Sequence, residues 1–400
     1  MPNMRGRVLI VDPDNFTPLY DVNLARALVN EGWDVEWVTS PHQFDRMPDA
    51  FPAKIRESFF ARIKCPPAKD FLHSVHNPQR LRKILKAACY PMDLALFTRS
   101  FVGTQPGIIH AQWALFPYLD AIFWKTLRRM GWLIVFTCHD PIPLRGSLPR
   151  FYLRATNHLC SSADAIVVHG KWARGVLMEA GVPSEKIHII DPGPPIADWL
   201  GDRESARRSL GLNPTIPVVL FFGYIKQYKG LLILLESLPL IRRAAGDFIL
   251  IIAGEMMDDW SKYRQRVATL DIAGLLRWSD GYVPQEMSLA YFAAADIVVL
   301  PYLEASSSGV LLSAYTARKP VVASGIGDIP AMVADGETGI LVSPGNPAEL
   351  SRALADLMLD RQKAELMGTR GHELVRTRFN WERIAGLTGK LYCQLLRSGR

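Results

Sequence analysis

The sequence predicts an α/β protein built from two Rossmann-like domains, and three observations along its 400 residues lead to this prediction. Short apolar runs alternate with amphipathic stretches of helical period, which is the pattern of βα units with parallel strands. The run Asp191-Pro192-Gly193-Pro194-Pro195 then interrupts the alternation, because proline and glycine break both helix and strand. Beyond it the alternation starts again, with Val218–Phe222 as the next strand.

The composition fits a globular protein with a sizeable core, since 49% of the residues are hydrophobic and 21% are charged. No apolar run approaches the roughly 20 residues of a membrane span, and the N-terminus shows no signal-peptide core. The five cysteines are scattered and lack a C-x-x-C motif. They favour reduced thiols in a cytoplasmic protein over a disulfide framework or a zinc site.

The formal net charge of +7 is unevenly distributed. Eight cations lie between Arg46 and Lys86, against Asp49, Glu57 and Asp70: Lys54, Arg56, Arg62, Lys64, Lys69, Arg80, Arg82 and Lys83. Aromatic and apolar residues interleave with them, so this stretch is suited to anionic lipid headgroups at the inner face of a membrane. An ordinary solvated surface stays an open alternative. No motif for nucleic acid accompanies the charge, so we expect no nucleic-acid partner.

The first domain is predicted to start with the strand Arg7–Asp12, a loop, the helix 21–31 with Asp21 as its N-cap, and the strand Val35–Val38. The loop lacks G-x-G-x-x-G, so a dinucleotide site is not indicated. It instead holds Asn15 and Tyr20, close to Asp21.

Three further strands of this domain end in or beside a histidine: His110, His139 and His169. Because the ends of parallel strands meet at one edge of a sheet, these side chains are candidates for ligand contact. A hydrogen-bonded histidine near the core is the alternative for each of them.

The second domain carries two turns suited to phosphate. Gly223 follows the first strand, and Lys229 precedes Gly230 and a helix from Leu231, where a cation adds to the positive helix end. Lys226 is a second cation in this turn. Solvent exposure of either lysine is the alternative.

The second turn, Ser306-Ser307-Ser308-Gly309, joins the strand Ile297–Leu300 to a helix over 310–317. Serines cap such a helix, glycine permits close approach to the backbone, and the first N–H groups are left for an anion. A capped helix without a ligand is equally consistent with these residues.

The stretch Asp296–Gly339 resembles the donor-binding half of GT-B glycosyltransferases, in particular the retaining family 4 (glycosyl transferases group 1). The resemblance is carried by Pro301, Glu304, Ser308-Gly309-Val310, Pro320–Ser324, Gly325, Gly327, Pro330, Asp335-Gly336 and Thr338-Gly339. It implies two Rossmann-like domains facing each other across a cleft: residues 1–195 for the acceptor and 196–378 for the nucleotide sugar. The segment 379–400, whose start Phe379-Asn380-Trp381 also resembles the family, would be a helix that returns to the first domain.

The resemblance also implies roles for individual residues. His139, in Thr137-Cys138-His139, would contact the transferred sugar near its 6-hydroxyl, and Glu304 would reach the same sugar. Lys226 and Lys229 would hold the donor diphosphate. The remaining donor residues would be Gly223, Tyr282, Val283, Ser308, Gly309, Val310 and Ser313, and the acceptor side would comprise Asn15, Tyr20, Asp21 and His110. We assign His139, Glu304 and Lys229 to catalysis.

The sequence departs from the family pattern at three places. Tyr224 stands where the family has arginine, and Ala331 stands where a glutamate follows the "G-I-P" element. The second glutamate of the signature, which holds the ribose hydroxyls in the family, falls on Leu312 or Ser313.

The implied activity is transfer, with retention, of a sugar from a nucleoside diphosphate to a hydroxyl of a glycan or a lipid-linked acceptor in cell-surface polysaccharide synthesis. We expect no cofactor and no metal, because no aspartate-based metal motif is evident. Another GT-B enzyme, such as an epimerase or phosphorylase, is one alternative. A non-catalytic partner subunit is another, supported by the lost glutamate and by Tyr224.

Overall fold

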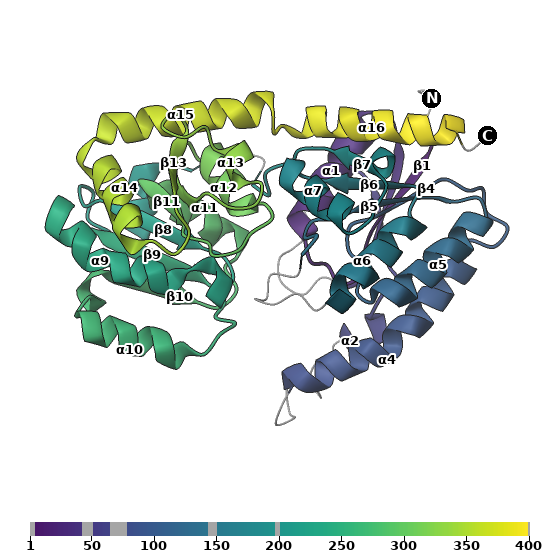
Figure 1. Cartoon of the computed structure of the whole chain (residues 1–400), viewed down its shortest axis with the longest axis horizontal. Coiled ribbons are helices and arrows are strands. Elements are labelled where there is room, and N and C mark those ends of the chain that lie inside the picture. The colour runs from purple at the N-terminus through teal and green to yellow at the C-terminus, as the bar shows by residue number, and fades with distance from the viewer. Residues whose placement is uncertain (1–4, 42–50, 65–77, 143–149, 197–200, 399–400) are drawn as a thin grey trace. The chain divides into compact units, whose positions relative to one another are not determined.

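The computed structural model describes residues 5–41, 51–64, 78–142, 150–196 and 201–398 (Figure 1). The chain divides into two compact units. Unit 1 comprises the described residues up to Asp191 together with those from Trp381 onward, and unit 2 runs from Pro192 to Asn380. Each unit is built on one parallel sheet, so the predicted fold class of two Rossmann-like domains is confirmed. The sequence analysis placed the two domain boundaries after residues 195 and 378, and the units of the structure change after Asp191 and Asn380.

The sheet of unit 1 has the strand order β3-β2-β1-β4-β5-β6-β7, and every neighbouring pair is parallel. Its strands are β1 (Arg7–Asp12), β2 (Asp34–Thr39), β3 (Lys54–Glu57), β4 (Ile108–Ala111), β5 (Leu133–Thr137), β6 (Ala165–Val168) and β7 (Ile187–Ile189). The order of the strands reverses between β1 and β4, and α/β sheets bind ligands beyond the carboxyl ends of the strands at such a point.

Helices cover both faces of this sheet. Leu24 and Leu28 of α1 (Pro18–Asn30) and Ile384 of α16 (Trp381–Ser398) share a core with one face. The opposite core, which includes Leu9 and Phe136, is closed by other helices. These are α2 (Ala61–Lys64), α4 (Pro78–Arg99), α5 (Pro117–Arg129), α6 (Arg150–Ser162) and α7 (Lys171–Glu179), among which α4 lies beside α5 (Figure 1).

The predicted N-cap role of Asp21 is wrong. Helix α1 begins at Pro18 with Thr17 as its N-cap, because proline at the first position already has the helical φ angle. Asp21 therefore lies inside the first turn, and it is fully buried.

The sheet of unit 2 has the strand order β10-β9-β8-β11-β12-β13 and is also parallel. Its strands are β8 (Val218–Phe222), β9 (Ile249–Gly254), β10 (Leu276–Asp280), β11 (Ile297–Leu300), β12 (Val321–Ser324) and β13 (Gly339–Val342). Val298 and Leu300 belong to one core and Ile297 and Val299 to another, so β11 is buried on both faces as predicted. The strand order reverses between β8 and β11.

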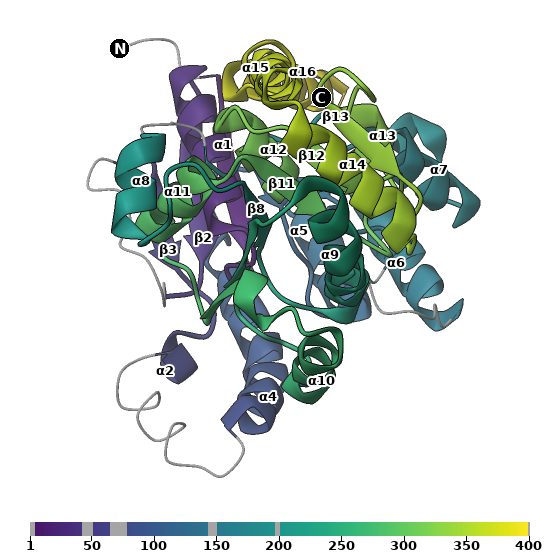
Figure 2. The ribbon, with the colours of Figure 1, turned by 90° about the vertical axis from the view of Figure 1, so that its left-hand side faces the viewer.

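One face of this second sheet is covered by α9 (Leu231–Ala245), α10 (Trp260–Leu270) and α14 (Pro347–Leu359), of which α9 and α14 pack side by side (Figure 2). The other face is covered by α8 (Arg203–Ser209), α11 (Gln285–Ala294), α12 (Gly309–Thr316) and α13 (Ile329–Met332). Helix α15 (Arg361–Thr377) contributes side chains to both cores.

Among the helices of the described residues, we find none whose length and apolar character would suffice to cross a bilayer.

Candidate active site

The turns after β8 and β11 of unit 2 meet where the strand order reverses. Gly223, directly after β8, has a φ of +100°, and a Cβ built on it would lie 3.6 Å from Lys229 Nζ and 3.8 Å from Val310 Cγ2. The ammonium group of Lys229 and the first turn of α12 are therefore brought together above this glycine. The lysine turn and the serine turn, which the sequence analysis treated separately, thus lie next to each other in the fold.

Gly230 holds the lysine turn in place. The residue has a φ of +72°, and a Cβ there would collide with the carbonyl oxygen of Pro301, which follows β11. Only glycine permits both this backbone conformation and this close approach. Lys229, the last residue of a 3-10 turn that begins at Gln227, is thus positioned by backbone packing.

Tyr302 connects the lysine to the serine turn. Lys229 Nζ donates a hydrogen bond of 3.1 Å to Tyr302 Oη and lies 4.6 Å from the centroid of its ring. The same hydroxyl lies 3.4 Å from Ser308 Oγ. The sequence analysis did not single out Tyr302, although its place directly after Pro301 at a strand end was a usable signal.

Ser308 caps α12 as predicted, because its Oγ accepts a hydrogen bond of 3.3 Å from the backbone N–H of Leu311. The N–H groups of Gly309 and Val310 belong to the first turn and have no acceptor within the helix. They carry the positive end of the helix dipole, and Lys229 adds a full charge beside it.

Two predicted donor residues have structural contacts of their own. A Cβ on Gly309 would lie 2.9 Å from Pro195 Cγ, so the group that approaches this glycine is the ring of a linker proline. Ser313 is buried and donates its hydroxyl to the carbonyl oxygen of Gly309 at 3.0 Å. Its hydroxyl is therefore engaged inside α12, at one of the two positions on which the family's ribose-binding glutamate falls.

The remaining predicted donor residues differ in how far they are exposed to solvent. Glu304 is half-buried in the turn after β11. Lys226 Nζ lies 5.8 Å from the centroid of the Tyr224 ring, so it stands beside the residue that replaces the family's arginine. Tyr282 is exposed, whereas Val283 packs against the core of unit 2.

In unit 1 the predicted acceptor-side residue His110 is a core residue. Its Nδ1 lies 2.6 Å from Tyr392 Oη and its Nε2 lies 2.7 Å from Thr137 Oγ1, so both ring nitrogens are used. Burial lowers the pKa of His110 to about 3, which keeps the ring neutral. His110 is therefore a hydrogen-bonded histidine near the core, which was the alternative to ligand contact.

His139 lies in a half-buried aromatic setting at the carboxyl end of β5. Trp113 stacks on its ring at a centroid distance of 5.1 Å, and Tyr20 meets it edge-on at 5.1 Å. Its Nδ1 lies 3.0 Å from His169 Nε2, and its Nε2 lies 3.2 Å from Gln112 Oε1.

The carbonyl oxygen of Ile190 fixes the protons of this pair. It lies 3.1 Å from His169 Nδ1 and can only accept, so this nitrogen carries a proton. Burial lowers the pKa of both histidines, and in the neutral pair His169 Nε2 then accepts from His139 Nδ1. His139 Nε2 then carries a lone pair, which cannot form a hydrogen bond with Gln112 Oε1. The opposite orientation of this amide, with its NH2 group, which has no other partner among the described residues, donating to His139 Nε2, satisfies both side chains.

Asp21, also predicted on the acceptor side, lies buried near Asp12 inside unit 1. Asp12 Oδ2 accepts from the backbone N–H of Thr17 at 3.0 Å. Burial raises the pKa of Asp12 to about 6, and burial together with the charge of Asp12 raises the pKa of Asp21 well above its usual value. The fold therefore disfavours ionisation of both carboxyl groups at once.

This pair makes stability depend on pH. Because its folded pKa values are raised, the folded state binds more protons, and stability falls as pH rises from about 4 through about 6 and beyond. We expect Asp21→Asn to reduce this loss by on the order of 1–3 kcal/mol, because the amide has no proton to lose. Calorimetric melting of both proteins between about pH 5 and pH 8 measures it, and parallel stability curves would contradict the raised pKa of Asp21.

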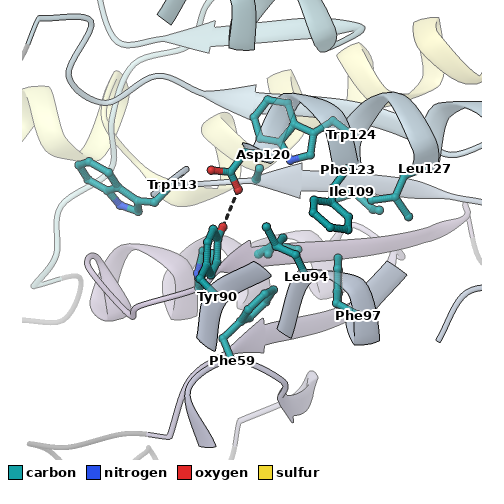
Figure 3. Close-up of a pocket in the computed structure, with 13 residues that line it drawn as sticks. Phe59, Tyr90, Leu94, Phe97, Ile109, Trp113, Asp120, Phe123, Trp124 and Leu127 are labelled. Carbon is teal, nitrogen blue, oxygen red and sulfur yellow. Dashed lines mark hydrogen bonds between the residues drawn. The ribbon is translucent and has the colours of Figure 1, made fainter. Parts of the chain in front are cut away.

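Near the reversal point of the unit 1 sheet lies a small apolar cavity. Phe59, Leu94 and Phe97 line it together with Trp113, and Tyr90 donates a hydrogen bond of 2.5 Å to Asp120 at its wall (Figure 3). Its volume is about 20 Å³, which is room for a single water molecule. The cavity is too small for a sugar, and Asp120 is occupied in holding Tyr90 and the backbone N–H of Phe116.

Comparison with known protein families decides which class of protein these two sites belong to. Residues 216–360 match the family described as "Glycosyl transferases group 1", and residues 20–196 match the family described as "Glycosyltransferase Family 4". The first match contains the lysine and serine turns, and the second contains the histidine pair. The chain is a GT-B glycosyltransferase of family 4.

Relatives of this glycosyltransferase include two proteins named D-inositol 3-phosphate glycosyltransferase. The one from Segniliparus rotundus is 28% identical over 77% of this chain and 72% of its own length. The one from Nocardia farcinica is 30% identical over 70% of this chain and 66% of its own length.

Solved structures share the fold at lower identity. Sucrose-phosphate synthase from Thermosynechococcus elongatus has a TM-score of 0.75 at 20% identity, covering 98% of this chain and all of that one. HepE from Anabaena, in complex with UDP-glucose, has a TM-score of 0.71 at 17% identity, covering 98% and 100% of the two chains.

Proposed function

We propose that this glycosyltransferase moves a sugar from a nucleoside diphosphate to a hydroxyl group of a glycan or a lipid-linked acceptor, with retention of the anomeric configuration. The observation that carries the proposal is the convergence of Lys229, Tyr302 and the capped N-terminus of α12 above Gly223. A positive group of this kind is suited to a diphosphate, and it lies where parallel sheets bind ligands.

The demanding part of the reaction is the negative charge that develops on the leaving diphosphate. Lys229 is held by Tyr302 and by the glycine turn before any ligand arrives, so its charge needs little reorganisation. The N–H groups of Gly309 and Val310 would take further phosphate oxygens. Lys226, beside Tyr224, would supply a second cation in place of the family's arginine.

His139 is the unit 1 residue that we assign to the donor sugar. Its Nε2 is an acceptor whose orientation is fixed by His169 and by the Trp113 ring. A sugar hydroxyl would donate to this nitrogen by taking the place of the Gln112 amide. Neutral histidine is required for this role, and burial keeps the pKa of His139 well below its usual range.

The acceptor is the least determined part of the proposal. Asn15 remains as the half-buried member of the predicted acceptor side, whereas Tyr20, Asp21 and His110 are buried. Contact with an anionic membrane would use exposed cations of the basic stretch such as Lys54 and Lys83. Arg56 is less available, because it pairs with Glu36 at 2.6 Å.

Product analysis tests this function. The purified chain is incubated with UDP-, ADP- and GDP-sugars and with an acceptor panel that includes glycans, lipid-linked sugars and D-inositol 3-phosphate, the substrate in the relatives' name. We expect one nucleotide sugar to give a glycoside whose anomeric proton shows the donor's configuration by NMR. An inverted product would contradict retention, and an epimerised sugar or a sugar phosphate would contradict glycosyl transfer to a hydroxyl.

A further inference from the structure

Unit 2 contains a pocket at the amino ends of its strands, whereas the donor turns lie at their carboxyl ends. Pro217, Asp296 and Pro320, which directly precede β8, β11 and β12, form its floor, and α14 and α15 form further walls. The donor turns follow the carboxyl ends of β8 and β11. A strand of this length separates the two places by on the order of 13 Å, so the pocket is not part of the donor site.

The pocket has a volume of about 170 Å³, which is room for roughly ten water molecules. Four cations line it against two carboxylates: Arg203, Arg318, Lys319 and Arg361 against Asp296 and Glu365. The lining therefore carries a net positive charge inside a concave surface, where low-dielectric walls strengthen the field.

Asp296 is already saturated by its own partners. Its Oδ1 accepts from Arg203 at 2.9 Å, and its Oδ2 accepts from the buried Arg207 at 2.6 Å and from the backbone N–H of Val218 at 2.8 Å. These bonds occupy both oxygens, so the carboxylate has little capacity left for the remaining cations of the pocket.

Lys319 is half-buried in this pocket and, among the residues that the structure describes, has no ion pair. Its Nζ donates to the carbonyl oxygen of Ala293 at 3.0 Å, and no carboxylate of the described residues lies within ion-pair distance. Burial, together with the nearby Arg203, Arg207 and Arg361, lowers the pKa of Lys319 to about 8 against the opposing effect of Asp296. An anion in the pocket would meet ammonium protons that the fold leaves unused.

Arg318 and Arg361 flank Lys319. Arg318 has a φ of +57°, an uncommon conformation for a non-glycine residue, and its carbonyl oxygen packs so closely on Gly368 that a Cβ there would collide with it. Arg361 is the first residue of the 17-residue helix α15, whose amino end is itself positive. Its Nε donates to Glu365 Oε1 at 3.0 Å, and its other N–H groups are not used by this pair. Backbone packing thus directs an arginine and a helix end to the same pocket.

We propose that this basic pocket binds a small phosphorylated metabolite through its phosphate monoester group, as a site separate from the donor site. Planar guanidinium groups match phosphate oxygens in pairs, and Lys319 supplies a point charge. The pocket is larger than a phosphate group, so it also has room for the small organic part of a phosphate ester.

Calorimetric titration tests the site with inorganic phosphate and glucose 6-phosphate, at constant ionic strength. A saturating amount of the donor nucleotide, meaning the one of UDP, ADP and GDP that the chain binds, is present. We expect saturable binding that this nucleotide does not displace and that Arg318→Ala/Arg361→Ala weakens at least about tenfold. Both residues are exposed, so this variant should fold, and Arg370→Ala on the exposed face of α15 is the charge-matched control. Absence of binding, displacement by the donor nucleotide, or equal affinity in the double variant would overturn the proposal.

A second readout uses sulfate, whose charge does not change near neutral pH. Because an anion favours protonated Lys319, sulfate affinity should fall by about fivefold to tenfold between about pH 7 and pH 9.5, as the pKa near 8 is crossed. Lys319→Met should remove this pH dependence. A pH-independent affinity in the wild-type chain would overturn the assignment of Lys319. Since the donor nucleotide is bound at its own site throughout the titrations, failure here leaves the glycosyltransferase proposal standing.

Discussion

Lys229→Met is expected to lower kcat/KM by on the order of 10²–10³, the range seen when a preorganised group that stabilises developing charge is removed. The substitution keeps the length of the side chain and removes only its charge. The diphosphate then loses the cation that Tyr302 and the glycine turn hold in position. Initial rates with the donor identified by product analysis measure the effect.

Two matched variants separate this effect from general electrostatics. Lys226→Met removes a charge from the same turn, but its ammonium lies against the Tyr224 ring and not against Tyr302, so we expect a smaller loss. Tyr302→Phe keeps the lysine and removes the hydroxyl that orients it, and it should cost about tenfold. A Lys229→Met enzyme that is folded and as active as Lys226→Met would show that Lys229 does not bind the leaving group.

His139→Ala is expected to lower kcat by about 10², since the variant loses the ring nitrogen that we assign to the donor sugar. His169 acts through His139 by accepting its Nδ1–H, so it is a positioning residue. We expect His169→Ala to cost about tenfold in kcat, with a smaller effect on the KM for the donor. Half-buried His158 on α6 provides a control histidine outside the pair.

The pH profile distinguishes positioning from a general structural role. The pKa of His139 is lowered first by burial and then by the charges of His169 and His110, so the wild-type rate should fall only in acid below about pH 6.5. His169 is one of the groups that lower the pKa of His139. We therefore expect His169→Ala to raise this pKa and to move the acid limb of the rate profile to higher pH. An unchanged acid limb in His169→Ala would contradict the coupling of the two histidines.

Much of the fold was predictable because the signals are local. Buried strands such as Ile297–Leu300, the glycine turn at Gly223 and the N-cap Ser308 each depend on a few neighbouring residues. Helical period and apolar runs therefore identified the βα alternation along most of the chain. The predicted strand β11 agrees with the structure in both of its ends.

The remaining features depend on contacts between residues that are distant in sequence. Edge strand β3 is largely exposed, so it lacks the apolar run that marks a buried strand. The helix α4 was missed because its cations were interpreted as a surface stretch. Asp21 and His110 were misplaced because their partners, Asp12 and Tyr392, are revealed only when the sheet and α16 are assembled.

The measurement that tests the central claim most directly is calorimetric titration of UDP, ADP and GDP into the wild-type chain and into Lys229→Met. The structure predicts saturable binding of one of the three, weakened at least about tenfold in the variant, because the diphosphate loses a charge-assisted contact. Absence of saturable binding by all three, or equal affinity in the two proteins, would contradict a diphosphate site at Lys229 and the N-terminus of α12.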